Sequence, residues 1–152
     1  MTLLDAKEYD PGPARRRKIK IVAALALIIL LAAVVWMNRY RPEKHVVDKF
    51  FAALMNKDYD TAYGIYFADP QWKEHPAKYS RYPLNQFIQD WGEGGQWGII
   101  RNYKVNGAST CSSGASGVVV DVIVNGRAEH AQLWVEKSDN TLSPPPCELL
   151  FR

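Results

Sequence analysis

The feature that most constrains this chain is an apolar run near its start. The run "IVAALALIILLAAVVWMN", residues 21–38, contains eighteen residues without a formal charge. At about 1.5 Å per residue, a helix of this length spans roughly 27 Å, close to the hydrocarbon thickness of a bilayer. No face of the run carries a stripe of polar residues, which disfavours a buried core helix. The run therefore predicts one membrane-spanning helix over residues 19–38.

The basic residues that flank this run predict its orientation. Residues 15–20 contain five Lys and Arg, and residues 39–44 contain three. Because cytoplasmic flanks carry the excess of Lys and Arg, the N-terminus is expected in the cytoplasm. Residues 39–152 would then lie outside it, as a periplasmic or other extracytoplasmic domain on a cell (inner) membrane.

A cleaved signal peptide is the rival interpretation of the same region, because "RRRKIK" suits the basic start of such a peptide. The apolar run is longer than the usual hydrophobic region of a signal peptide, however, and no A-x-A-like cleavage site follows it before "NRYRP". An uncleaved signal anchor is therefore the prediction.

Charge is distributed unevenly between the two sides of the anchor. Residues 1–18 are interrupted by "PGP" and predict a disordered cytoplasmic tail. Residues 1–38 hold six Lys and Arg against three Asp and Glu, whereas residues 39–152 hold thirteen of each. A charge-balanced domain lacks the basic surface that nucleic-acid binding requires, so no nucleic-acid partner is expected.

Apolar residues recur at helical spacing in three segments after the anchor. The first helix begins near Pro42, the second is capped by Asp58, and the third runs from Pro83 to Gly92. The residues expected to face inward are Val46, Val47, Phe50, Phe51 and Leu54, then Tyr59, Ala62, Tyr63 and Tyr66, then Leu84, Phe87, Ile88 and Trp91. The segment "ADPQWKEHPAKYSRYP" between the second and third helices is predicted as a loop at the rim of a cavity.

The period then changes from helical to alternating. The segments "GIIRNYKVNG", "GVVVDVIV", "RAEHAQLWVEK" and "CELLF" predict four strands. Asn125-Gly126 tolerates positive φ and predicts a two-residue hairpin turn between the second and third. That turn would place Asp121 opposite His130. Three helices followed by an antiparallel sheet predict an α+β domain with the helices on one side.

The stretch "VVDKFFAALMNKDYDTAYGIY" resembles the opening of NTF2-like domains. In these domains a helix with a "ffaal" core is followed by a short break, a "Dy..Ay" pattern, a third helix and a curved sheet. The resemblance covers residues 43–152 and implies a cone-shaped cavity between sheet and helices. Family members use this cavity as an enzyme pocket, a ligand site or a core, and the outer sheet face often mediates dimerisation or partner binding. Residues 39–152 are thus expected to form an NTF2-like domain of three helices packed on a curved antiparallel sheet.

The two cysteines fit an oxidising compartment. Cys111 precedes the second predicted strand and Cys147 begins the last, so a bridge would join distant parts of the sheet. A disulfide is favoured over two free buried thiols outside the cytoplasm. No second Cys or His lies at ligand spacing, so neither a metal nor a cofactor is expected.

Two groups of residues are candidates for function. Asp121 and His130 are the candidate catalytic pair, because a carboxylate can orient an imidazole as a general base. A cross-strand salt bridge explains the same pair without catalysis. The aromatic candidates for binding a partner or a small apolar or sugar-like ligand are Tyr59, Tyr63, Tyr66, Trp72, Tyr79, Tyr82 and Trp134. Aromatic residues at helical spacing equally suit a core.

Two classes of function follow from these features. The first is a single-pass protein with a non-catalytic NTF2-like domain that binds an envelope partner or forms a homo-oligomer, similar to scaffolding components of envelope-spanning secretion machines. The second is a pocket enzyme of the ketosteroid-isomerase or dehydratase type that uses Asp121 and His130. The anchor, the balanced charge and the single acid/base pair favour the first class.

The predicted orientation can be tested with reporter fusions. A phosphatase that folds only outside the cytoplasm should be active in intact cells when it is fused after Arg152, because that position is expected outside. A reporter that works only in the cytoplasm should be silent at the same site. The opposite pattern would contradict the orientation and remove the reason for expecting an oxidised cysteine pair.

Overall fold

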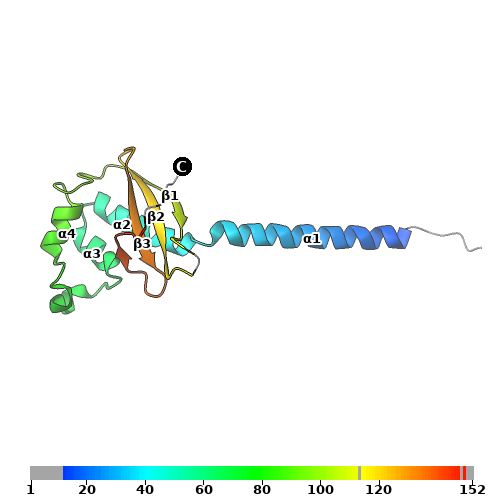
Figure 1. The fold of residues 1–152 in the computed structure, drawn as a ribbon, viewed down its shortest axis with the longest axis horizontal. Coiled ribbons are helices and arrows are strands. Elements are labelled where there is room, and N and C mark those ends of the chain that lie inside the picture. The colour runs from blue at the N-terminus through cyan, green and yellow to red at the C-terminus, as the bar shows by residue number, and fades with distance from the viewer. Residues whose placement is uncertain (1–11, 113, 148, 150–152) are drawn as a thin grey trace, which may run out of the picture. The chain divides into compact units, whose positions relative to one another are not determined.

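The structure, a computed structural model, describes residues 12–112, 114–147 and 149 (Figure 1). The chain divides into two compact units, Met1–Arg39 and Tyr40–Arg152. The described part of the first unit contains one long helix, and the second unit is a mixed helix-and-sheet domain.

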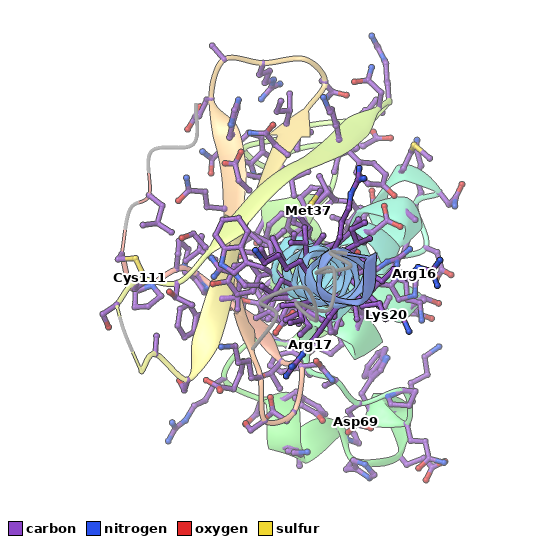
Figure 2. All side chains as sticks on the ribbon, turned by 90° about the vertical axis from the view of Figure 1, so that its right-hand side faces the viewer. Arg16, Arg17, Lys20, Met37, Asp69 and Cys111 are labelled. Carbon is purple, nitrogen blue, oxygen red and sulfur yellow. A yellow bond between two sulfur atoms is a disulfide. The ribbon has the colours of Figure 1, made fainter. Side chains whose placement is uncertain are left out.

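Helix α1 (Gly12–Asn38) is long and apolar enough to cross a membrane. Its large apolar side chains lie on the surface, with Val35 71% and Met37 78% exposed. Figure 2 looks along α1 and shows Arg16 and Lys20 projecting to one side and Arg17 to another. The helix begins at Gly12 and so includes part of the predicted tail, while residues 1–11 of that prediction lie outside the described residues.

The second unit begins with the three predicted helices, α2 (Arg41–Met55), α3 (Tyr59–Tyr66) and α4 (Leu84–Trp91). Two of the predicted helix boundaries are confirmed, the start of α3 at Asp58 and the end of α4 at Gly92. The Asp58 side chain accepts a hydrogen bond of 3.1 Å from the Thr61 backbone and caps α3. A Cβ at Gly92, which ends α4, would lie 2.3 Å from the Ile88 carbonyl oxygen, so this close approach requires glycine.

The segment between α3 and α4 contains two short 3-10 helices, η1 (Trp72–Glu74) and η2 (Pro76–Tyr79). Four antiparallel strands follow, in the order β1-β2-β3-β4. Their bounds are β1 Tyr103–Ser109, β2 Gly117–Val124, β3 His130–Glu136 and β4 Leu142–Ser143. The predicted α+β class is therefore confirmed. Strand β4 was not predicted, and the strand predicted over residues 147–151 lies largely outside the described residues, which include only Cys147 and Leu149 of it.

The predicted pairing of β2 with β3 is wrong by two residues. Asp121 lies opposite Gln132, and His130 lies opposite Ile123. Asn125 and Gly126 do have positive φ, and the Arg127 backbone donates to the Val124 carbonyl at 3.0 Å. The turn therefore forms, but strand pairing begins only at Ile123 and His130.

Contacts with the segment before β1 account for this wider hairpin. The Asn125 side chain accepts a hydrogen bond of 2.8 Å from the Arg101 backbone, and the Arg127 guanidinium donates to the Gln96 carbonyl at 2.8 Å. These bonds draw residues 125–129 away from the ladder. A shift of two residues leaves every side chain on its predicted face.

The core lies between the sheet and the helices, which gather on one side of it (Figure 1). Alternate residues of β2 point into this core, and Phe50, Phe51 and Phe87 pack against them with no exposed surface. Ile88, predicted to face inward, is 37% exposed, so that prediction is wrong. Helix α4 has only eight residues and buries fully only Phe87.

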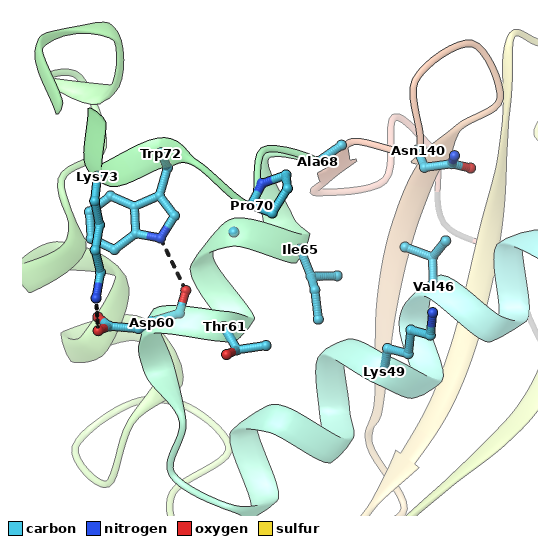
Figure 3. Close-up of a pocket in the computed structure, with 11 residues that line it drawn as sticks. Val46, Lys49, Asp60, Thr61, Ile65, Ala68, Pro70, Trp72, Lys73 and Asn140 are labelled. Atoms are coloured by element: carbon cyan, nitrogen blue, oxygen red, sulfur yellow. Dashed lines mark hydrogen bonds and ion pairs between the residues drawn. The ribbon is translucent and has the colours of Figure 1, made fainter. Parts of the chain in front are cut away.

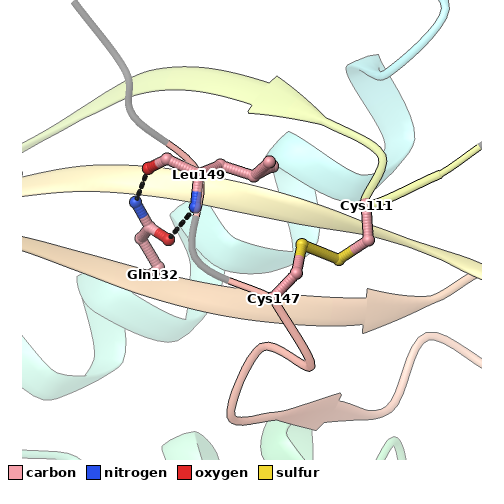
Figure 4. Close-up of a disulfide and its surroundings, with 4 residues drawn as sticks. All are labelled: Cys111, Gln132, Cys147 and Leu149. Carbon is pink, nitrogen blue, oxygen red and sulfur yellow. Dashed lines mark hydrogen bonds between the residues drawn. A yellow bond between two sulfur atoms is a disulfide. The ribbon is translucent and has the colours of Figure 1, made fainter.

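The predicted disulfide joins Cys111 to Cys147 (Figure 4). The bridge connects the segment before β2 to the segment after β4. The Gln132 side chain donates to the Leu149 carbonyl at 2.6 Å and accepts from the Leu149 backbone at 3.4 Å. Figure 4 shows these contacts on the face of the sheet opposite α2.

Removing the bridge should destabilise the domain. The cysteines lie 36 residues apart, and constraining a loop of that length contributes about 4 kcal/mol by the chain-entropy estimate. We expect C111S/C147S to lower the melting temperature by about 10 to 15 °C. The wild type in reductant should melt like the double variant. Unchanged melting of both would show that the bridge does not constrain the unfolded chain.

Candidate functional site

A groove of about 490 Å³ lies between α2, α3 and the segment that follows α3 (Figure 3). We call it the Trp72 groove. Its lining residues are Val46, Lys49, Asp60, Thr61, Gly64, Ile65, Ala68, Pro70, Trp72, Lys73 and Asn140. Most of them come from two helices and one loop that are close in sequence. The groove therefore belongs to the helical half of the domain.

Trp72 is held in place at one wall of this groove. Its indole nitrogen donates to the Asp60 carbonyl at 3.2 Å, and its ring packs edge-on against the Tyr63 ring at 4.7 Å. The Lys73 ammonium pairs with the Asp60 carboxylate and lies 5.5 Å from the centre of the Trp72 ring. The indole orientation is thus fixed from three directions.

Asp69 organises the loop that carries Trp72, and Figure 2 places it in the segment between α3 and α4. Its backbone donates to the Gly64 carbonyl at 2.8 Å and accepts from the Trp72 backbone at 3.3 Å. Its carboxylate accepts from the Gln71 backbone at 3.0 Å and from the Tyr79 hydroxyl. The Tyr79 hydrogen bond is the main reason why the pKa of Asp69 lies below its ordinary value.

The groove combines an apolar floor with one available cation. Val46 and Ile65 are partly buried and supply apolar surface. Lys73 is engaged by Asp60, whereas the Lys49 ammonium has no hydrogen bond or ion pair within the described part of the chain. This arrangement suits a ligand that presents an apolar group beside a carboxylate.

A second hollow, of about 530 Å³, runs along the edge of β3. We call it the His130 cleft. Its lining residues are Tyr66, Tyr82, Asp90, Trp91, Gln96, Trp97, His130, Ala131, Gln132, Leu133, Pro144 and Pro145. Successive strand residues point to opposite faces of a sheet. A hollow that touches four consecutive residues of β3 therefore follows the edge of the strand.

Asp121 and His130, which lines this cleft, are in contact as predicted, although they are not opposite each other. The Asp121 side chain is fully buried, and its Oδ2 lies 2.8 Å from His130 Nδ1. The contact is diagonal, because Asp121 lies opposite Gln132, whose amide is 3.5 Å from Oδ1. A carboxylate accepts hydrogen bonds, so Nδ1 donates and Nε2 remains for other contacts.

Asn106 is a further member of this group that the sequence analysis missed. Its side-chain amide donates to Asp121 Oδ2 at 2.9 Å. The register of β1 shifts between Val105 and Gly107, and this bulge turns Asn106 toward Asp121. The buried carboxylate thus has three polar neighbours, which offset the cost of removing it from water. Gly107 was the one local signal of a bulge.

The opposite wall of the His130 cleft is aromatic. The Tyr82 hydroxyl donates to Asp90 Oδ2 at 2.8 Å, and the ring centres of Tyr66 and Tyr82 lie 5.8 Å apart. Burial is the main cause that raises the pKa of both tyrosines, and the Asp90 charge adds to it. Both phenols therefore stay protonated at neutral pH.

The aromatic candidates separate into different environments. Tyr66 and Tyr82 line the His130 cleft, and Trp72 lines its own groove. Tyr63 and Tyr79 are buried in the core, with exposed fractions of 1% and 6%. The two remaining candidates pack elsewhere. Tyr59 packs partly buried against the core, and Trp134 covers Gly117, where a Cβ would lie 2.4 Å from the indole.

Comparisons with protein-family models, with curated proteins and with solved structures found no match for this chain. Within the described residues no cluster of three or more His, Cys, Asp or Glu side chains could hold a metal ion. Function is therefore inferred from α1 and from the chemistry of the two hollows.

The loop that forms the Trp72 groove should loosen in acid. Because the pKa of Asp69 is lowered from 3.8, its contribution to stability is present above pH 3.8 and is lost as the pH falls through the lowered value. The protection of residues 68–83 against hydrogen exchange, corrected for the intrinsic rate at each pH, should fall below pH 3.8 in the wild type. In Asp69→Asn this exchange should already be faster at pH 6 and should respond less to acid. Identical profiles would show that Asp69 does not hold the loop.

Proposed function

We propose that this chain is a single-pass membrane protein whose extracytoplasmic, NTF2-like domain binds a protein partner in the cell envelope without catalysis. Helix α1 spans the membrane with its N-terminus in the cytoplasm. The Trp72 groove receives the partner, and the domain serves as a scaffold in an envelope assembly. A second copy of the chain is the alternative occupant of the groove, which would make the protein a homo-oligomer.

The character of α1 supports the membrane assignment. A helix of 27 residues with apolar side chains on all sides has no stripe to bury against a soluble partner. Exposed fractions of 48% to 78% leave large apolar residues such as Val34 and Met37 without cover. A lipid bilayer covers such a surface completely. The larger number of basic residues before the apolar run supports a cytoplasmic N-terminus.

The order of elements supports the NTF2-like assignment. Two helices joined by a short break are followed by a third helix and an antiparallel meander, as in the family that the sequence resembles. Phe50, Phe51 and Phe87 fill the space between helices and sheet. Such a filled interior agrees with a domain that acts through its surface.

The observation that carries the binding proposal is the fixed Trp72 side chain beside an apolar groove. A rigid aromatic ring loses little conformational entropy when a partner packs against it, which is why Trp recurs as an interface anchor. Trp72 is partly buried and already hydrogen-bonded. The neighbouring Lys49 ammonium offers a charge contact to a carboxylate of the partner.

A pocket enzyme of the ketosteroid-isomerase or dehydratase type is the second candidate. One observation favours it: His130 lines a cleft while the fully buried Asp121 holds its Nδ1 at 2.8 Å. Its Nε2 would then act as the general base on a small hydrophobic substrate. The same contacts also describe a buried polar network that stabilises the sheet.

Variants of the groove can separate binding from folding. Trp72→Ala should weaken crosslinking to the partner in intact membranes by about tenfold or more, as expected for an interface anchor. Lys49→Glu should weaken it as well, with an unchanged melting temperature, because Lys49 is exposed and has no partner in the described structure. Lys104→Glu, an exposed charge on β1, is the matched control and should crosslink normally.

The same experiments can also favour the enzyme interpretation over the binding interpretation. If the wild type crosslinks to nothing, stays monomeric and converts a small hydrophobic substrate, the enzyme interpretation holds. Loss of that conversion in His130→Ala and Asp121→Asn, but not in Lys49→Glu, would assign it to the His130 cleft.

A further inference from the structure

Aromatic side chains and a carboxylate converge on one wall of the His130 cleft. The Tyr82 hydroxyl donates to Asp90, and Trp91 follows Asp90 at the end of α4. Tyr66 lies next to Tyr82, and the negative charge of Asp90 acts on both phenols. Three aromatic residues and one exposed carboxylate therefore line the same part of the cleft.

The charge of the cleft is one-sided. Asp90 is exposed, and it is the one carboxylate among the lining residues that the structure describes. Among the lining residues that the structure describes there is no Lys or Arg. The Arg127 guanidinium donates to the backbone carbonyl of Gln96, a lining residue, at 2.8 Å. The Gln96 side chain in turn donates to Glu129, a further carboxylate.

We propose that the His130 cleft binds a small organic ammonium ion with an apolar body. The faces of aromatic rings attract cations, and this attraction strengthens where water is partly excluded. Tyr66, Tyr82 and Trp91 would surround the ammonium group, and Asp90 would balance its charge.

The size of the cleft agrees with this class of ligand. Its volume of about 530 Å³ falls within the range of about 300 to 1,000 Å³ found for small-molecule pockets. Leu133, Pro144 and Pro145 supply apolar surface for the body of the ligand. The site is separate from the Trp72 groove, with which it shares no lining residue, so the inference does not rest on the proposed partner.

Choline and its uncharged isostere 3,3-dimethyl-1-butanol provide a direct test, because they share a shape and differ in charge. The full chain would be placed in nanodiscs of phosphatidylglycerol, which contain no ammonium headgroup, and titrated by calorimetry against empty nanodiscs. We expect choline to bind and the isostere to bind at least tenfold more weakly. Asp90→Asn should lose about tenfold in choline affinity while keeping the Tyr82 hydrogen bond. Glu74→Gln, an exposed acid outside the cleft, is the matched control and should bind as the wild type does.

Three results would overturn the proposal. Equal binding of choline and the isostere would mean an apolar pocket without charge selection. Binding of a neutral disaccharide in place of choline would reassign the aromatic wall to sugar recognition. No binding of choline at millimolar concentration, with an unchanged melting temperature, would show that the cleft takes no ammonium ligand. Lys49→Glu should leave choline binding intact, which separates this test from that of the Trp72 groove.

Discussion

Two adjacent phenylalanines of α2 determine how the rest of the domain is arranged. The Phe50 ring lies 5.0 Å from that of Trp91 and 6.1 Å from those of Tyr66 and Phe87, so it joins α2 to α3 and α4. The Phe51 ring lies 5.5 Å from that of Tyr103 in β1. Neighbouring residues of a helix point about 100° apart. Two adjacent residues of α2 therefore contact the other helices and the sheet from the same turn of the helix.

This arrangement also fixes the walls of both hollows. Helix α4 carries Asp90 beside Trp91, so the packing of Trp91 against Phe50 sets the distance between α4 and the edge of β3. Helix α3 begins next to α2 and turns Tyr63 inward, where the Tyr63 ring supports the Trp72 indole. The tyrosine hydroxyl also donates to the Tyr82 carbonyl at 2.6 Å. A change in the core would thus move both surfaces together.

The parts of this structure that local chemistry determines could be predicted from the sequence. Asp58 caps the start of α3 through its own hydrogen bond, and Gly92 ends α4 because it lacks a side chain. The register of the hairpin could not be predicted in the same way. Asn125 and Gly126 adopt the expected turn. Arg101 and Gln96, more than twenty residues earlier in the chain, hydrogen-bond to Asn125 and Arg127.

The residues of the candidate site also differ in whether local sequence or distant contacts determine their positions. Asp121 and His130 were recognised because a shift of two residues keeps both on one face, and a diagonal contact replaces the direct one. Asn106 joins them only because β1 bulges, and the alternating pattern of the sequence carries no sign of that bulge beyond Gly107. The Asp90 wall lies forty residues away from His130 and depends on tertiary packing.

The His130 cleft exists because the first half of β3 has no strand beside it on the β4 side. Strand β4 has two residues and pairs only with Trp134 and Val135, which leaves the edge at residues 130–133 without a ladder partner among the described residues. The chain continues there as Pro144 and Pro145, and proline has no N–H with which to extend a ladder. An edge of this kind resists pairing with a second sheet, because the prolines and the wall of α4 lie beside it. The same two prolines that prevent strand addition thus leave a space that a small ligand, but not another strand, can enter.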